Sequence, residues 1–301
     1  MESNLAQLSN ELENAIERAA SHVVAVHGRA HVSSSGFIFR ERVVVTAQHA
    51  LRREEDIRVT LPNGETVEAT LAGSDGGSDI AVLRMENKTP PLPAARAENL
   101  RPGQIVLSLG RSRDSGINAS MGIISAVSGE WRPWRGGRLE SYIRLDLTLF
   151  PASAGGPVVT PSGELVGMAS PALSRIAPLA VPHSAIDRIV DDILSKGRVA
   201  RGYLGVGLQP VTIPDRLKQS LGYTAGSAVI VFSVEPGSPA EKSGIVIGDV
   251  LLSIAGHDLR SVEELHSVLD SRLIGKTVPL TLSRGGERKD LEITVAERGA
   301  Q

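Results

Sequence analysis

The chain has 301 residues, a formal net charge of −2, 41% hydrophobic residues and no cysteine. This length favours two domains, and the nearly neutral net charge gives no overall attraction to nucleic acid or to anionic lipid. The lack of cysteine excludes disulfides, thiolate catalysis and cysteine-ligated zinc. The 31 glycines and 17 prolines are typical of a protein built from short strands and turns.

The first twenty residues predict a short amphipathic helix. Leu5, Leu8, Leu12 and Ile16 recur at helical spacing, with acidic residues between them. This apolar stripe would pack either on its own domain or against another subunit. The stretch has no basic segment followed by an apolar one, and no apolar run in the chain is long enough to span a bilayer. We therefore expect a cytoplasmic protein without a membrane span, or a periplasmic one if a leader was removed.

Strand signals dominate from residue 21 to about residue 170. Each run is rich in Val, Ile or Thr and is bounded by Gly, Pro, Asn or Asp, and the Asn63-Gly64 pair predicts a hairpin. The predicted strands are 22–28, 36–47, 56–62, 66–73, 79–85, 104–110, 121–129, 141–147, 156–160 and 164–170. Many short strands joined by turns predict an all-β barrel domain.

A helix predicted near residues 184–196 closes this domain. Ser184 is expected to cap its start, and Gly197 is expected to end it. The second domain then predicts an initial strand, a short helix near 214–221, strands near 228–234 and 249–255, a helix over 261–271 and two final strands. The resulting division is an N-terminal helical segment (1–20), a β domain (21–198) and a second domain (199–301).

Three separate pieces of the first domain suggest acyl-transfer chemistry. His49 follows the apolar run "VVVTA", and Asp79 stands directly before another apolar run, where its carboxylate can orient an imidazole. The third piece is the loop "PASAGGP" (151–157), whose glycines suit a backbone that points N–H groups at an oxyanion. The order His, Asp, loop is one of the known orders of a Ser–His–Asp triad.

With these pieces in place, the first domain resembles the HtrA (DegP-like) family of trypsin-like serine proteases. The resemblance rests on "VVVTAQHAL" (43–51), "SDIAVLRM" (78–85), "GIISAVS" (122–128), "IRLDLTLFPASAGGPVVTPSGELVGM" (143–168) and "LAVPHSAI" (179–186). The second domain resembles the PDZ domain of the same family through "RGYLGVGLQP" (201–210) and the segment 234–269. The family implies a mainly β fold: a trypsin-like double barrel of twice six strands with the catalytic site between the barrels, then a PDZ β-sandwich with two helices. It also implies a homotrimer or a higher oligomer.

The family motif carries over residue by residue, with departures in the loop. His49 corresponds to the general base, Asp79 to its orienting carboxylate, and Ala154 to the position of the nucleophilic serine. The family's loop reads Gly-Asn-Ser-Gly-Gly-Pro, so Ala152 replaces the oxyanion glycine and Ser153 stands one step before the nucleophile. The expected oxyanion hole is formed by Ala152, Ser153 and Ala154. Ser153 is not expected to act as nucleophile, because a slip of one residue turns its side chain away from His49.

Two interpretations of Ala154 remain open. In the first, the chain is an ATP-independent serine endopeptidase of protein quality control that cleaves unfolded polypeptides, and its serine was replaced artificially by Ala154. In the second, the chain is a natural pseudoprotease that serves as a peptide-binding scaffold or chaperone. Ala152 and Ser153 favour the second. In both cases no hydrolysis is expected from the sequence as written, and the small apolar segments 152–154, 168–170 and 179–181 are expected to wall the substrate pocket.

The PDZ resemblance implies a groove for unfolded or C-terminal peptides. A loop with a glycine would offer backbone N–H groups to a terminal carboxylate, and the peptide would add as a strand. The expected peptide-binding residues are Tyr203, Leu204, Gly205, Val206, Leu265 and Val268. The alternative is a closed core without a groove. No cofactor, metal site or nucleic-acid partner is expected, and the segment 131–138 ("WRPWRGGR") is either a partner contact or a packed, solvated loop.

Overall fold

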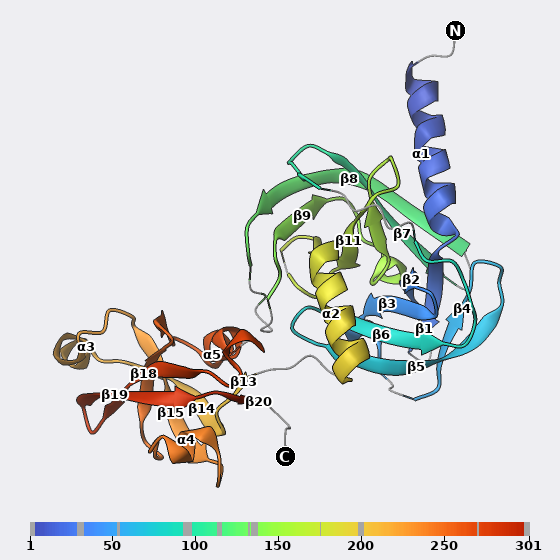
Figure 1. Ribbon diagram of the computed structural model, residues 1–301. Coiled ribbons are helices and arrows are strands. Elements are labelled where there is room, and N and C mark those ends of the chain that lie inside the picture. Colours follow the sequence, from blue (N-terminus) through green and yellow to red (C-terminus); the bar gives the residue numbers. More distant parts are fainter. Residues whose placement is uncertain are drawn as a thin grey trace. The chain divides into compact units, whose positions relative to one another are not determined.

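The computed structural model describes residues 4–28, 33–52, 55–92, 98–112, 116–131, 133, 138–174, 176–197, 202–269 and 271–297. The chain divides into two compact units, residues 1–199 and 200–301 (Figure 1). Each unit has its own hydrophobic cluster, as expected of independent domains.

The first unit contains two closed antiparallel barrels. The first barrel has the strand order β1-β2-β3-β6-β5-β4, and the second has the order β10-β11-β12-β9-β8-β7. Their bounds are β1 (Val23–His27), β2 (Ser34–Arg40), β3 (Val43–Ala47), β4 (Ile57–Thr60), β5 (Thr66–Asp75), β6 (Ile80–Met85), β7 (Ile105–Ser112), β8 (Gly116–Ser128), β9 (Tyr142–Asp146), β10 (Pro157–Val159), β11 (Leu165–Ser170) and β12 (Leu179–Pro182). This arrangement confirms the predicted mainly β, double-barrel fold.

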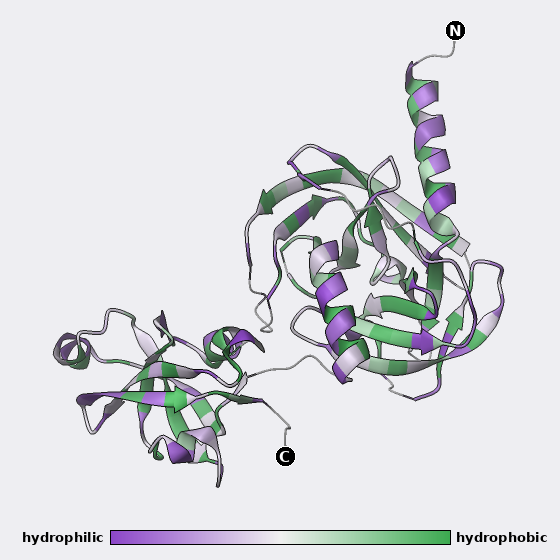
Figure 2. Ribbon diagram, in the orientation of Figure 1, coloured by the Kyte–Doolittle hydropathy of each residue, from purple (hydrophilic) through white to green (hydrophobic). Residues whose placement is uncertain are grey.

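One buried cluster joins the two barrels, in addition to a cluster inside each barrel. Phe37 and Val45 of the first barrel belong to the same buried cluster as Leu107, Leu109 and Met168 of the second. The strands are accordingly dominated by apolar residues, whereas helices α1 (Asn4–Ala20) and α2 (His183–Lys196) alternate apolar and polar residues (Figure 2). Burial of the apolar strand faces is the main force that holds the barrels against each other.

Helix α1 packs only its second half on the first unit. Ala15 and Ala19 are buried, and Leu12 and Ile16 pack against the shared core. Leu5, near the start of the helix, is 78% exposed. One apolar stripe therefore serves the unit's own core at one end and faces solvent at the other.

Of three local predictions, one is confirmed and two are wrong. The Asn63-Gly64 hairpin is confirmed, because β4 and β5 pair antiparallel around Gly64, which has φ +87°. The prediction of a single strand over 36–47 is wrong. The polar Glu41-Arg42 turn, with Arg42 at φ +63°, divides this segment into β2 and β3. The predicted cap at Ser184 is also wrong, because β12 runs straight into α2 and the extended Pro182 takes the cap position.

The end of α2 follows the prediction. Gly197 adopts a left-handed conformation with φ +73°, and its N–H donates to Ile193 O at 2.8 Å. Glycine is favoured at this position because it has no Cβ to clash.

The second unit has a sheet of order β14-β15-β16-β18-β19, with β17 paired to β16 and a separate β13-β20 pair. Three helices accompany the strands in its described part, one short helix more than the two expected. The bounds are β13 (Gly202–Tyr203), β14 (Val206–Thr212), α3 (Asp215–Leu221), β15 (Ser227–Val234), α4 (Pro239–Lys242), β16 (Val250–Ile254), β17 (His257–Asp258), α5 (Val262–Val268), β18 (Thr277–Arg284), β19 (Glu287–Thr294) and β20 (Ala296–Glu297).

Candidate active site and peptide groove

Two neighbouring strands place His49 beside Asp79. β3 and β6 pair antiparallel, with Ala47 opposite Ile80, so the end of β3 and the start of β6 meet. His49 follows β3 in a 3₁₀ turn, and Asp79 directly precedes β6. His49 Nδ1 lies 2.8 Å from Asp79 Oδ2 and 2.9 Å from Asp79 Oδ1. The sheet pairing therefore joins two residues that are 30 positions apart in the chain.

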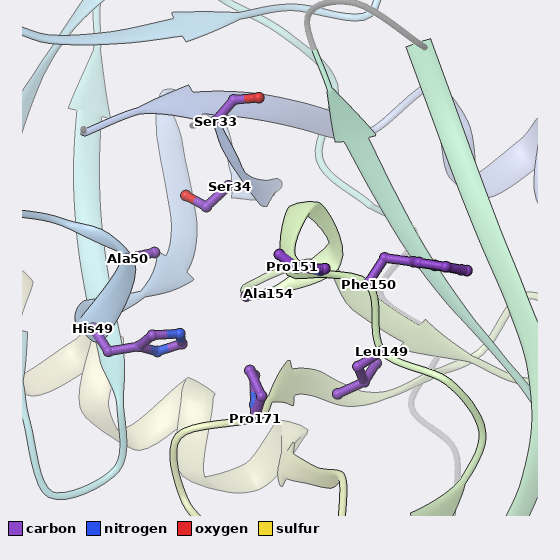
Figure 3. A pocket seen from close by; sticks show the side chains of 9 residues that line it. All are labelled: Ser33, Ser34, His49, Ala50, Leu149, Phe150, Pro151, Ala154 and Pro171. Atoms are coloured by element: carbon purple, nitrogen blue, oxygen red, sulfur yellow. The ribbon is translucent and has the colours of Figure 1, made fainter. Parts of the chain in front are cut away.

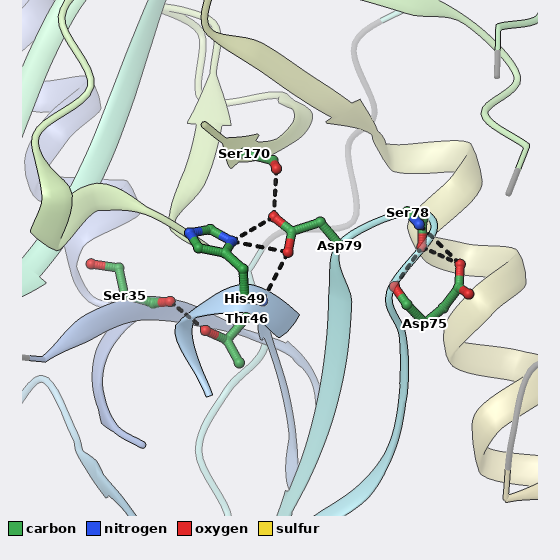
Figure 4. Close-up of polar contacts among 7 residues, drawn as sticks. All are labelled: Ser35, Thr46, His49, Asp75, Ser78, Asp79 and Ser170. Carbon is green, nitrogen blue, oxygen red and sulfur yellow. Dashed lines mark hydrogen bonds and ion pairs between the residues drawn. The ribbon is translucent and has the colours of Figure 1, made fainter. Parts of the chain in front are cut away.

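The Asp79 carboxylate is buried and held by several donors. It accepts the His49 backbone N–H at 2.9 Å and the Ser170 hydroxyl at 2.5 Å, in addition to the imidazole (Figure 4). The backbone of Asp79 has φ +61°, a left-handed conformation that aspartate tolerates better than most residues. Ser78, next to it, donates its hydroxyl to Asp75 at 2.6 Å and so fixes the preceding turn. These contacts orient the carboxylate, which in turn orients the imidazole.

The other ring nitrogen of His49, Nε2, points away from Asp79 (Figure 4). His49 also lines a pocket of about 260 Å³ together with Ala154 (Figure 3). The remaining lining residues are Ser33, Ser34, Ala50, Leu149, Phe150, Pro151 and Pro171. The pocket thus contains an oriented imidazole. The side chain at position 154 is a methyl group, which has no hydroxyl that could give a proton to that imidazole.

The loop that carries Ala154 is a 3₁₀ turn over Pro151–Ser153. Within it, the Ser153 N–H donates to Phe150 O at 2.8 Å, and the Ala154 N–H donates to Pro151 O at 3.4 Å. Gly155 follows with φ +83°, and a Cβ added there would stand 2.4 Å from Ser35 O. Glycine at 155 is therefore required both by the backbone conformation and by the close approach of β2.

Ser153 does not line the pocket that His49 and Ala154 share. It is 1% exposed, and its hydroxyl lies against Gly110: a Cβ added to Gly110 would stand 2.7 Å from Ser153 Oγ. Of the expected wall residues, Ala154 lines the pocket, whereas Met168–Ser170 and Leu179–Val181 are buried strand residues of the second barrel.

Sequence reasoning missed two serines that shape this site. Ser170 binds the Asp79 carboxylate, and Ser35 binds the loop of Ala154 through its hydroxyl and its backbone N–H. Both are fully buried, yet neither lies in a motif that suggests chemistry. Their roles depend on strand pairing and on the meeting of the two barrels, so no local sequence signal could have identified them.

The segment 131–138 is described only at residues 131, 133 and 138. Trp131 packs edge-to-face on Tyr142, with ring centroids 5.2 Å apart, and pairs in a β-bridge with Leu139. Arg138 lies 2.8 Å from a Glu130 carboxylate oxygen. The described ends of this segment are therefore packed and ion-paired within the first unit, and Arg132, Trp134 and Arg135 lie outside the described residues.

In the second unit, the turn between β13 and β14 presents backbone donors. Within the described part of the chain, the N–H groups of Leu204 and Gly205 have no hydrogen-bond partner. Their carbonyl groups are engaged: Leu204 O accepts from Ala240 N–H at 2.9 Å, and Gly205 O accepts from Glu235 N–H at 2.8 Å. Gly205 has φ +80°, and a Cβ there would stand 2.2 Å from Ser238 Cβ. The Tyr203 hydroxyl donates to the Glu235 carboxylate.

The strand that follows this turn lies at one end of the sheet order, and helix α5 lies beside it. Leu204, Leu265 and Val268 share one buried cluster, and Val206 packs partly buried against it. The six expected peptide-binding residues therefore come together around the turn, the start of β14 and α5. Because Leu204, Leu265 and Val268 are buried, the edge of β14 and the turn are the parts of this region that a peptide can reach.

Neither unit offers a metal site in its described residues, where no group of three or more His, Cys, Asp or Glu side chains is placed to hold an ion. Among the same residues, no helix combines the length and the apolar character needed to cross a bilayer.

Comparison with known proteins gives a match for each unit. Residues 34–168 match the trypsin-like peptidase domain family, and residues 202–295 match the PDZ domain family. A probable periplasmic serine endoprotease, DegP-like, of Halomonas elongata is 29% identical over 87% of this chain, and the chain spans 56% of that relative's length. The serine endoprotease DegS of Haemophilus influenzae is 27% identical over 95% of this chain and 87% of its own.

The solved structures include a similar protein with a bound peptide. The HtrA-type protease AlgW with tripeptide is 27% identical and has a TM-score of 0.68, covering 96% of this chain and 98% of its own. The order of the two domains and these relatives together support the membership of this chain in the HtrA-type, trypsin-like peptidase and PDZ family.

Proposed function

We propose that this chain is a peptide-binding member of the HtrA-type family that does not cleave polypeptides as its sequence stands. The observation that carries the proposal is the turn of the PDZ unit, where Leu204 and Gly205 keep unpaired N–H groups beside an edge strand. A terminal carboxylate supplies the acceptors that these donors lack, and an extended peptide pairs with the edge of β14. Peptide complexes of the similar AlgW protease fit this kind of ligand.

The lack of cleavage follows from the chemistry of position 154. Acyl transfer in this family needs a hydroxyl that gives its proton to the imidazole while it attacks the peptide carbonyl. Ala154 has no such hydroxyl, and Ser153 lies outside the pocket. His49, Asp79 and Ser170 then form a complete proton-accepting arrangement without a nucleophile to serve.

That completeness favours a second candidate function. With serine at position 154, His49 would act as general base and Asp79 as its orienting group, and the chain would be an ATP-independent endopeptidase of unfolded proteins. The names of its relatives, which are serine endoproteases, support this candidate. It requires that Ala154 replaces a natural serine.

Calorimetry with one peptide in two forms tests the proposal. A peptide with an apolar last residue and a free carboxylate is expected to bind in the micromolar range, or about −8 kcal/mol. Amidation removes the charged acceptor and should weaken binding about tenfold or more, because charge-assisted hydrogen bonds are stronger than neutral ones. Equal affinities for the two forms would show that the PDZ unit does not recognise a chain end.

Incubation with casein tests the absence of cleavage. The unmodified chain should leave casein intact and should not react with a fluorophosphonate, which labels activated serines. Labelling of the unmodified chain would contradict the proposal whatever the PDZ unit binds.

We further propose that the chain forms a homotrimer through its N-terminal helix. Leu5 and Leu8 are 78% and 39% exposed, although they continue the stripe that Ala15 and Ala19 bury. An exposed continuation of a buried stripe suits a subunit contact. Light scattering should give three times the 31.8 kDa chain mass, and Leu5→Glu with Leu8→Glu should give the monomer.

The compartment is also a matter of proposal. Relatives named as periplasmic proteases support a periplasmic location, in contrast to the cytoplasmic location expected from the N-terminal sequence. Fractionation of cells that produce the chain from its natural gene distinguishes the two.

A further inference from the structure

The loop before Ala154 has one peptide group whose direction decides whether an anion can bind there. An oxyanion hole needs the N–H groups of residues 152 and 154 to converge on one point. The Ala154 N–H instead points at Pro151 O, 3.4 Å away. Because a trans peptide holds its C=O and N–H in opposite directions, the N–H of Ala152 must point away from the Ala154 N–H. The two donors diverge as long as the Pro151–Ala152 peptide keeps this direction.

Ser35 holds two peptide groups that follow the Pro151–Ala152 peptide, through the carbonyl oxygens of Ala152 and Ala154. Its hydroxyl donates to Ala152 O at 2.5 Å and accepts the Arg111 N–H at 2.8 Å. Its backbone N–H donates to Ala154 O at 3.0 Å. Its own carbonyl accepts the Thr46 hydroxyl at 2.7 Å, which anchors Ser35 in the first barrel (Figure 4). The loop is therefore attached to the opposite barrel both before and after the Ala154 N–H.

The Pro151–Ala152 peptide is the least restrained peptide group of the loop. Its N–H has no hydrogen bond among the described residues, and its carbonyl takes part only in the long contact with Ala154 N–H. Ser35 holds the following peptide group through Ala152 O, and the Ser153 N–H holds the preceding one through Phe150 O. The Pro151–Ala152 peptide therefore turns over by rotation about Pro151 ψ and Ala152 φ. A proline accepts both the helical and the extended value of ψ. Ala152 has a negative φ in the present turn, and the reversal of the peptide takes φ to a positive value.

We infer that Ala152 keeps the anion-binding site of this loop closed, independently of the hydroxyl that Ala154 lacks. An alanine pays a steric penalty at positive φ that a glycine does not, because its Cβ clashes with the backbone. The inference extends the proposal that the chain does not hydrolyse peptides: replacing Ala154 alone would restore the nucleophile without restoring the hole. Ser35 is the positioning residue: because it holds Ala152 O and Ala154 O, the peptide turns by joint rotation about Pro151 ψ and Ala152 φ, and the steric penalty falls on Ala152 φ.

Amide hydrogen exchange tests the closed loop in the full chain, without any need for catalysis. In Ala152→Gly, the N–H of residue 154 should exchange about tenfold faster, as the left-handed conformation becomes accessible. Ala152→Ser is the matched control, since it keeps the Cβ and should exchange like the unmodified chain. Equal exchange rates at residue 154 in all three proteins would overturn the inference.

Reactivity toward a fluorophosphonate gives a second readout in chains that carry Ala154→Ser. Ala154→Ser alone and Ala152→Ser with Ala154→Ser should react slowly, and Ala152→Gly with Ala154→Ser at least tenfold faster. Measurable but equal rates for Ala154→Ser with and without Ala152→Gly would also overturn the inference. Faster exchange at residue 154 in Ala152→Gly supports it even if none of the serine variants reacts. Reaction of the unmodified chain bears only on the proposed function.

Discussion

The Ser170 hydroxyl lies 2.5 Å from Asp79 Oδ2, although 91 residues separate the two in the chain. Ser170 ends β11 of the second barrel, whereas Asp79 precedes β6 of the first. The hydrogen bond therefore joins the two barrels at the buried carboxylate that orients His49. It links the packing of the barrels to the geometry of the candidate active site.

Removal of this hydroxyl should destabilise the first unit. Ser170→Ala is expected to lower the free energy of unfolding by about 1.5–3 kcal/mol, because a buried carboxylate loses a donor. The two tryptophans of the chain are Trp131 and Trp134, so tryptophan fluorescence in a urea titration reports on the first unit alone. Ser162→Ala, at an exposed position, is the control and should change stability by less than about 0.5 kcal/mol. An unchanged midpoint in Ser170→Ala would contradict the assigned role.

The loss of the Ser35 hydroxyl should have a comparable effect on the same unit. Ser35→Ala leaves Ala152 O and the Arg111 N–H without the partner that each has now, in a site shielded from water. An unsatisfied buried polar group costs about 1–3 kcal/mol. The same fluorescence titration measures the change. Stability equal to that of the unmodified chain would mean that other groups hold the loop.

The sequence was sufficient for the fold and for the His49–Asp79 pairing, but not for the conformation of the loop. Alternating and continuous apolar runs mark strands because burial depends on side-chain period. The order of the motifs around His49, Asp79 and the loop then carries the resemblance to the HtrA family. The 3₁₀ turn at Pro151, by contrast, depends on hydrogen bonds from Ser35, more than a hundred residues earlier. The wrong cap at Ser184 has a similar origin: the path of β12, and not the local propensity, decides where α2 begins.

Each unit should fold without the other. The first unit comprises residues 1–199 and the second residues 200–301, and each has its own core cluster. A chain that ends at residue 199 should retain the β-rich circular dichroism spectrum and a cooperative thermal transition, and so should a chain of residues 200–301. An unfolded spectrum for either piece would show that the two units share their stability.

The second unit should lose stability in acid through Asp249. Burial alone would raise the pKa of Asp249, but hydrogen bonds from Arg284, 2.8 Å from each carboxylate oxygen, and from the Val246 N–H hold it below its ordinary value. Because the folded pKa lies below the unfolded value of about 3.9, the stabilisation is complete above that pH. It disappears as the pH falls through the lower folded pKa.

Asp249→Asn tests this account in residues 200–301. The substitution should lower the free energy of unfolding by about 1–3 kcal/mol at pH 7, since the bidentate contact with Arg284 loses its charge. The difference between the two proteins should shrink as the pH falls below about 4. A difference in stability that stays constant from pH 7 to pH 2 would rule out the ionised carboxylate as its source.

The turn at Gly205 should be the most sensitive position for peptide binding. Valine at 205 would have to adopt the present φ of +80° and would place its Cβ 2.2 Å from Ser238 Cβ, so the turn must move. Since the Leu204 and Gly205 N–H groups are the proposed carboxylate donors, Gly205→Val should weaken binding of the free-carboxylate peptide at least tenfold. The same variant should bind the amidated peptide almost as well as the unmodified chain does, because that peptide has no carboxylate to lose.

Gly226→Val is the control: a Cβ at Gly226 meets no atom within 4 Å and needs no positive φ. Calorimetry with both peptides decides the matter, and an equal loss of affinity for the acid and the amide in Gly205→Val would assign the turn a structural role instead of a carboxylate site.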